Sequence, residues 1–128
     1  MSIGVLGDIA FEASANKVLT WRDARRNGSA RWAKHDVFAK KPVLEFIGPD
    51  LEQFRLSVRL DMALGVVPRD ELHRMRLARD TGAVLQFTVG GQLVGDFVIK
   101  DISESLNVID SKGVLILAVA ELSLEEYQ

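Results

Sequence analysis

The clearest pattern in the chain is a strict alternation of apolar and polar residues over positions 53–61. Phe54, Leu56, Val58 and Leu60 occupy every second position, and polar residues stand between them. Successive side chains of a β-strand point to opposite faces of its sheet, so this period of two predicts a strand with one buried and one solvated face. We therefore expect a fold organised around a sheet.

Other runs rich in β-branched and aromatic residues lie on both sides of this strand, bounded by glycine, proline and polar clusters. Such runs are typical of strands. The further predicted strands are Gly4–Phe11, Lys17–Arg22, Arg31–Phe38 and Pro42–Ile47 before it, and Val84–Val89, Leu93–Val108 and Val114–Leu124 after it. Short turns at Gly90-Gly91 and at Asp110–Gly113 indicate that the last three form a meander.

Details within the last strands refine this prediction. Gly95 and Asp101 should mark bends or bulges in the long middle strand. The last strand is apolar on both faces from Val114 to Val119, so we expect its first half to lie inside the sheet stack.

Two segments between the early strands are predicted to be irregular. Asp23–Ser29 is polar and contains two arginines, an asparagine and a glycine in succession, so we expect a mobile loop. Gly48-Pro49-Asp50 favours a turn, because proline presets φ at the second turn position. We expect a hairpin at this turn.

One helix is predicted over Pro68–Thr81. Proline suits the first helical turn, acidic residues follow it, arginines lie further along, and Gly82 supplies the stop. The face expected to pack on the sheet consists of Leu72, Met75 and Ala78, widened by Leu77.

Composition fits one globular domain. The chain has 128 residues, of which 48% are hydrophobic, and residues 1–128 show no repeat or linker that would divide them. The predicted fold class is α+β, mostly β, with one flanking helix. The longest apolar run falls well short of the roughly 20 residues that span a bilayer as a helix, so we predict no membrane span.

The residue pattern carries little chemistry. The chain has no cysteine, and its two histidines, His35 and His73, lie in different predicted elements without a carboxylate at metal-ligand spacing. The glycines form no phosphate-binding loop, the serines form no nucleophile elbow, and the adjacent acidic pairs do not converge. We predict that the protein is not an enzyme and uses no cofactor, metal or small-molecule substrate.

Aromatic and arginine side chains gather around the predicted polar loop. Tryptophan and arginine are enriched at the energetic centres of protein interfaces. The candidate protein interface consists of Trp21, Arg25, Arg26, Arg31, Trp32 and Phe38.

Two other interpretations of this cluster remain. Arginines and tryptophans also bind nucleic acid by phosphate contact and stacking, but Asp23 lies within the cluster and the chain carries a formal net charge of −2, so nucleic acid is disfavoured. Alternatively, both tryptophans belong to the core.

Several motifs occur in a specific order. They are Gly28-Ser29-Ala30-Arg31-Trp32, then Lys41-Pro42-Val43-Leu44-Glu45-Phe46-Ile47-Gly48-Pro49, then Pro68-Arg69 with Glu71-Leu72, and a closing Leu122-Ser123-Leu124-Glu125-Glu126-Tyr127. Over most of its length the chain resembles the tail protein U (GpU) family of contractile-tailed bacteriophages and prophages.

This resemblance implies a non-enzymatic structural component of a phage tail or phage-derived contractile particle, at the junction of baseplate and tail tube. It implies a tail-tube-like β-sandwich or barrel with the helix at about 68–81 on its flank. It also implies a homo-oligomeric ring, usually sixfold, that contacts other tail-tube and baseplate proteins and is assembled in the host cytoplasm. A nucleic-acid-binding module and a baseplate-associated hydrolase are the alternatives.

Overall fold

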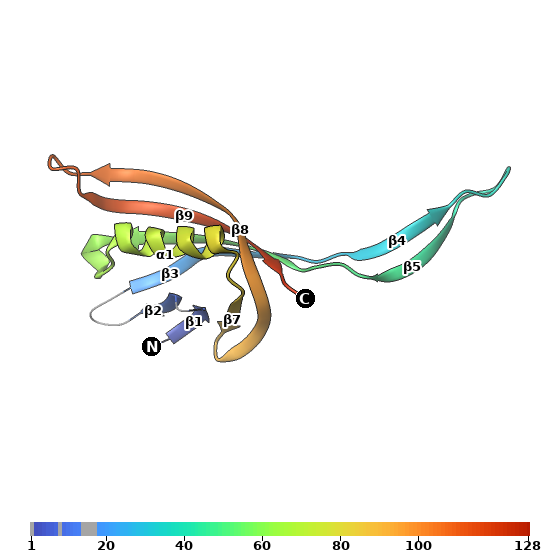
Figure 1. The fold of residues 1–128 in the computed structure, drawn as a ribbon, viewed down its shortest axis with the longest axis horizontal. Coiled ribbons are helices and arrows are strands. Elements are labelled where there is room, and N and C mark those ends of the chain that lie inside the picture. The colour runs from blue at the N-terminus through green and yellow to red at the C-terminus, as the bar shows by residue number, and fades with distance from the viewer. Residues whose placement is uncertain (1, 8, 14–17) are drawn as a thin grey trace.

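The fold is a β-barrel with one long projecting hairpin (Figure 1). A computed structural model describes residues 2–7, 9–13 and 18–128. The strands are β1 (Ser2–Leu6), β2 (Ile9–Ala13), β3 (Val18–Asn27), β4 (Ala30–His35), β5 (Val43–Pro49), β6 (Gln53–Asp61), β7 (Leu85–Val89), β8 (Gln92–Ile109) and β9 (Leu115–Glu126). The helices are a 3-10 turn, η1 (Met62–Leu64), and α1 (Pro68–Thr81). The predicted mostly β fold with a flanking helix is confirmed.

The barrel closes in the strand order β1-β2-β3-β6-β9-β8-β7, with β1 paired to β7. All of these pairings are antiparallel. Strands β4 and β5 form a separate two-stranded sheet that extends away from the barrel to the right in Figure 1. The molecule therefore has a compact body and one long extension.

The barrel core follows from the alternation in β6. Leu56, Val58 and Leu60 are at most 1% exposed, and their cross-strand partners on β9 are the equally buried Leu122, Ala120 and Ala118. Period-two patterning thus aligns two apolar faces. The strand predicted over residues 53–61 is confirmed in both its bounds and its buried face.

A cluster of aromatic rings forms a second part of the core, beside the paired faces of β6 and β9. Phe87 is fully buried and makes edge-to-face contacts with Trp21, Phe54 and Phe97, at ring-centroid distances of 6.1, 5.2 and 5.9 Å. Edge-to-face pairs add about 0.5–1.5 kcal/mol each beyond the burial of their area. The aromatic cluster ties β3, β6, β7 and β8 together.

Helix α1 has the predicted bounds and ends. Pro68 occupies the first turn, and Gly82 ends the helix in the left-handed conformation at φ 66°, with its N–H directed to the carbonyls of Ala78 and Arg79. Leu72 and Met75 are buried, whereas Leu77 is 54% exposed. Its predicted place on the packed face is wrong, because five residues from Leu72 correspond to about 140° of rotation away from it on a helix with 3.6 residues per turn.

The two leucines of α1 give a matched test of this packing. Leu72→Ala should lower the free energy of unfolding by about 2–5 kcal/mol, because it leaves a cavity between the helix and the sheet. Leu77→Ala should change it by less than about 0.5 kcal/mol, because that side chain is mostly in water. Urea denaturation of both variants measures the difference, and equal losses would contradict the assigned helix face.

Two predicted strands differ from the structure near the N-terminus. Gly4–Phe11 is not one strand but the hairpin β1–β2, in which Gly7 adopts a positive φ of 61° that glycine tolerates. Lys17 lies outside the described residues, and the strand predicted to end at Arg22 continues as β3 to Asn27.

The predicted mobile loop Asp23–Ser29 is therefore mostly wrong. Asp23 to Asn27 pair with β6 residues from Ser57 to Gln53. Backbone pairing to an existing strand needs no apolar side chains, so a polar composition did not prevent strand formation here.

The predicted hairpin at Gly48-Pro49-Asp50 is also wrong. β5 runs through Pro49 and pairs with β4, while β6 pairs with β3 and β9. The chain reverses instead at residues 36–42, and the Asp50 N–H donates to the Ser29 carbonyl at 3.0 Å. Proline is tolerated at the end of β5 because an edge position needs no N–H donor.

The meander formed by β7, β8 and β9 is confirmed, and both predicted irregularities in β8 lie beside shifts in register, at Gly95 and Asp101. The prediction for the first half of β9 is wrong, however. Val114 is 44% exposed, and full burial begins only at Ala118. The β8–β9 hairpin turn extends beyond the body of the barrel, at the left in Figure 1, and Leu115, Ile116 and Leu117 behind it are only partly buried.

Candidate protein-binding arm

Many large apolar side chains are exposed along the projecting hairpin formed by β4 and β5. We call residues 30–49, which include β4, its turn and β5, the arm. Trp32 lies opposite Phe46, and their rings meet edge to face at 5.1 Å. Lys34 lies opposite Leu44 two positions further out, so the same face of the ribbon carries all four side chains.

The tip of the arm is a tight turn. The Lys40 N–H donates to the Val37 carbonyl at 3.2 Å, and Ala39 takes a positive φ of 56°. This geometry leaves Phe38 97% exposed. A phenylalanine held in water at the end of a long hairpin is poorly placed to stabilise its own chain.

Exposure continues along both strands of the arm. The large apolar side chains that are at least 40% exposed are Trp32, Val37, Phe38, Val43, Leu44, Phe46 and Ile47. Exposed apolar surface of this kind marks an interaction site, and an isolated two-stranded hairpin is only marginally stable by itself. The arm is therefore the candidate surface for binding a partner protein.

The base of the arm is fixed to the barrel. Arg26 bonds Glu52 at 3.2 Å and lies 5.5 Å from the centre of the Phe54 ring. The Glu126 N–H donates to the Glu52 carbonyl at 2.8 Å. A Cβ at Gly28 would lie 2.6 Å from a carboxylate oxygen of Glu52, so glycine permits this close approach. These contacts set the direction in which the arm leaves the barrel.

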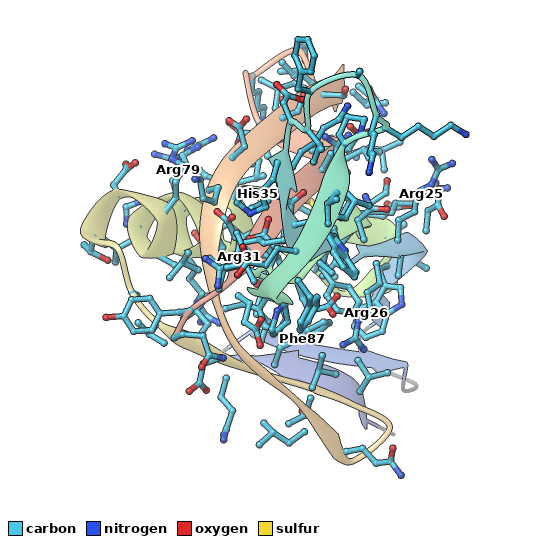
Figure 2. The ribbon with its side chains drawn as sticks, turned by 90° about the vertical axis from the view of Figure 1, so that its right-hand side faces the viewer. Arg25, Arg26, Arg31, His35, Arg79 and Phe87 are labelled. Carbon is cyan, nitrogen blue, oxygen red and sulfur yellow. The ribbon has the colours of Figure 1, made fainter. Side chains whose placement is uncertain are left out.

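The structure distributes the six candidate interface residues along β3 and the arm rather than into one cluster. Trp21 is half-buried in the barrel against Phe87. Arg25 and Arg26 are consecutive on β3 and so point to opposite faces, and they are separate in Figure 2. The remaining candidates lie on the arm: Arg31, Trp32 and Phe38.

The alternative that both tryptophans belong to the core therefore holds for Trp21 and fails for Trp32. Trp21 packs against the core, whereas Trp32 is 54% exposed. The apolar residues of β5 complete the arm surface but were missing from the candidate set. Their sequence signal was a short strand with apolar residues on both faces.

Apart from the arm, the protein has an open, polar groove of about 670 Å³ on the outer face of the sheet. Its charged lining includes Asp23, Arg25, Arg55, Asp101 and Glu121, which come from β3, β6, β8 and β9. Residues so distant in sequence could not be grouped by spacing. The arginines place positive charge among the carboxylates, and the groove is open to solvent.

Other chemical features are few in the part of the chain that the structure describes. Across residues 2–7, 9–13 and 18–128, no three histidine or acidic side chains form a metal-binding group. The pKa of the Asp80 carboxyl is lowered by a hydrogen bond from Arg79, but both residues lie on the surface of α1. Within the same described residues, no helix has the length and apolar character needed to cross a bilayer.

These features are typical of structural assembly proteins: a small barrel carries an arm that is anchored at its base and whose apolar side chains are exposed. Comparison with protein families agrees with this class. The family model described as Phage P2 GpU matches residues 7–128, and the chain belongs to that family. It is thus a structural protein associated with the phage tail, as the resemblance in its motifs implied. A search of curated proteins found no match.

Proposed function

We propose that the chain is a non-enzymatic subunit of a contractile phage tail or phage-derived particle, which forms a ring where the tail tube meets the baseplate. Family membership supports the tail, and the resemblance in the motifs supports the junction and a sixfold ring. On this proposal, the single domain of residues 1–128 is made in the host cytoplasm and assembles there with other tail-tube and baseplate proteins.

The observation that carries the proposal is the exposed apolar surface of the arm. Trp32 and Phe46 are each more than half exposed to solvent at the centre of the ribbon. Aromatic anchors of this kind carry much of the binding energy in protein interfaces. An obligate assembly contact of about 2,000 Å² or more would cover such a surface.

Deleting the gene from the phage or prophage that encodes it tests this function. We expect induced lysates to lack complete tails in electron micrographs, because a ring at the tube junction is needed before the tail can be finished. Expression of the wild-type chain from a plasmid should restore complete tails. Complete, normally abundant tails in the deletion strain would contradict the proposal.

The two alternative functions have separate readouts. A baseplate hydrolase should clear cell-wall material, and a carboxylate variant in the groove, such as Glu121→Gln, should abolish that activity. A nucleic-acid-binding module should show an affinity that falls steeply with salt. We expect neither behaviour from the purified protein.

A further inference from the structure

Two exposed apolar ribbons lie at opposite ends of the long axis of the molecule (Figure 1). One is the arm. The other is the outer part of the β8–β9 hairpin, residues 101–123, which we call the β8–β9 end. Asp101 and Ser123 pair with each other at its inner limit. Its apolar side chains that are 44–53% exposed are Leu106, Val108, Ile109 and Val114.

The two ribbons carry opposite charge. The arm has four basic and two acidic residues, a formal net charge of +2: Arg31, Lys34, Lys40 and Lys41 against Asp36 and Glu45. The β8–β9 end has one basic and four acidic residues, a formal net charge of −3: Lys112 against Asp101, Glu104, Asp110 and Glu121. Complementary potentials of this kind select partners and fix their orientation.

Existing contacts occupy part of this charge and leave the rest available. Glu104 is bonded to Arg76 of α1 at 2.6 Å, and the Asp110 carboxylate accepts N–H groups of its own turn. Glu121 is exposed and faces the open groove, whose charged lining has three acidic residues against Arg25 and Arg55. On the arm, Lys34 is exposed and stands on the same face as Trp32 and Phe46.

We propose that the arm of one copy docks on the β8–β9 end of a second copy, which rests on the self-assembly in the proposed function. Within one molecule the two ribbons point away from each other, so they cannot meet (Figure 1). A second copy supplies the apolar surface that the arm lacks, and the charge of opposite sign. Trp32 and Phe46 form the centre of the contact, and Lys34 of one copy is placed toward Glu121 of the other.

This arrangement is heterologous, since each copy donates one surface and accepts with a different one. Head-to-tail contacts of this type close into a ring when the rotation between neighbours allows it, and otherwise continue as a filament. An arrangement in which two arms pair with each other would instead stop at a dimer. The two geometries therefore predict different products from mixtures of variants.

Mixing two defective variants tests the proposal. The arm variant carries Trp32→Ser and Phe46→Ser, the end variant carries Val108→Ser and Ile109→Ser, and Leu77→Ser on α1 is the exposed-leucine control. Native mass spectrometry and light scattering should find large oligomers for wild type and control, and monomers for each variant alone. An equimolar mixture of the variants should give one-to-one heterodimers and nothing larger, because one intact arm meets one intact β8–β9 end.

A charge exchange gives a second, milder test in case the serine variants fold poorly. Lys34→Glu and Glu121→Lys should each weaken association at least tenfold at low salt, and the double variant should recover most of it. Melting curves that match wild type show that each variant is folded. Recovery specific to the double variant would identify this charge pair as lying across the contact.

Several outcomes would overturn the inference. They are an end variant that assembles alone like wild type, a mixture that stays monomeric beside an oligomeric wild type, no recovery in the charge-exchanged double variant, or a wild-type protein that is monomeric at every concentration. None of them alters the deletion result, which tests the tail function separately.

Discussion

Phe87→Ala will lower the free energy of unfolding by about 3–5 kcal/mol, the loss typical of a buried phenylalanine. Phe87 is fully buried at the meeting point of Trp21, Phe54 and Phe97, so its removal leaves a cavity and deletes three edge-to-face contacts. The loss should appear as a lower urea midpoint with an unchanged slope, because the surface exposed on unfolding is nearly the same.

Phe46→Ala is the matched control, since it removes the same atoms from a ring that is 57% exposed on the arm. Its free energy of unfolding should stay within about 1 kcal/mol of wild type. If Phe46→Ala were as destabilising as Phe87→Ala, the arm would be part of the stabilising core. The view that the barrel provides the stability and the arm adds little to it would then be wrong.

Triple substitution of the arm aromatics, Trp32→Ser, Phe38→Ser and Phe46→Ser, should reduce the yield of complete tails by roughly 100-fold or more. Central aromatic anchors of an interface cost about 2 kcal/mol or more each when truncated, and each 1.4 kcal/mol corresponds to a tenfold change in affinity. The measurement is a count of complete tails in lysates of the deletion strain that carries the variant gene.

The control for this experiment is Leu77→Ser with Leu93→Ser, because both leucines are more than half exposed but lie outside the arm. These variants should restore tails as well as wild type does. Normal tail counts with the triple arm variant, at equal expression, would show that the arm surface is not used in assembly.

The parts of the fold that were predictable from sequence are those with local signals. The alternation over 53–61 and the proline start and glycine end of α1 each report a single element, and both elements have the predicted bounds. Gly90-Gly91 likewise marks a turn wherever the neighbouring strands lie. Such signals require no knowledge of which strands become neighbours.

Features that depend on pairing between distant strands were not predictable in this way. The polar residues Asp23–Asn27 become a strand because β6 offers them a backbone edge, and Gly48-Pro49 is not a hairpin turn because β5 has β4 as its partner. The apolar first half of β9 suggested burial, but Leu115, Ile116 and Leu117 are only partly buried, because the β8–β9 hairpin runs out beyond the body of the barrel.

The candidate site shows the same division. Tryptophan and arginine content indicated an interface, but only the fold separates Trp21, which packs on Phe87, from the exposed Trp32. The contributions of Leu44 and Phe46 emerged once β4 and β5 were seen to form an isolated ribbon. Amphipathic strands do not reveal from sequence alone whether a second layer exists.

The most direct test of the structural role is to locate the chain on purified tails. An epitope tag can be placed beside Gln128, because this residue is exposed, follows β9 and lies outside both proposed contact surfaces. Electron microscopy with a gold-labelled antibody should find the label at one fixed position, at the baseplate end of the tail tube. Tails that are complete and infective but carry no label, while the tagged chain remains free in the lysate, would contradict the account.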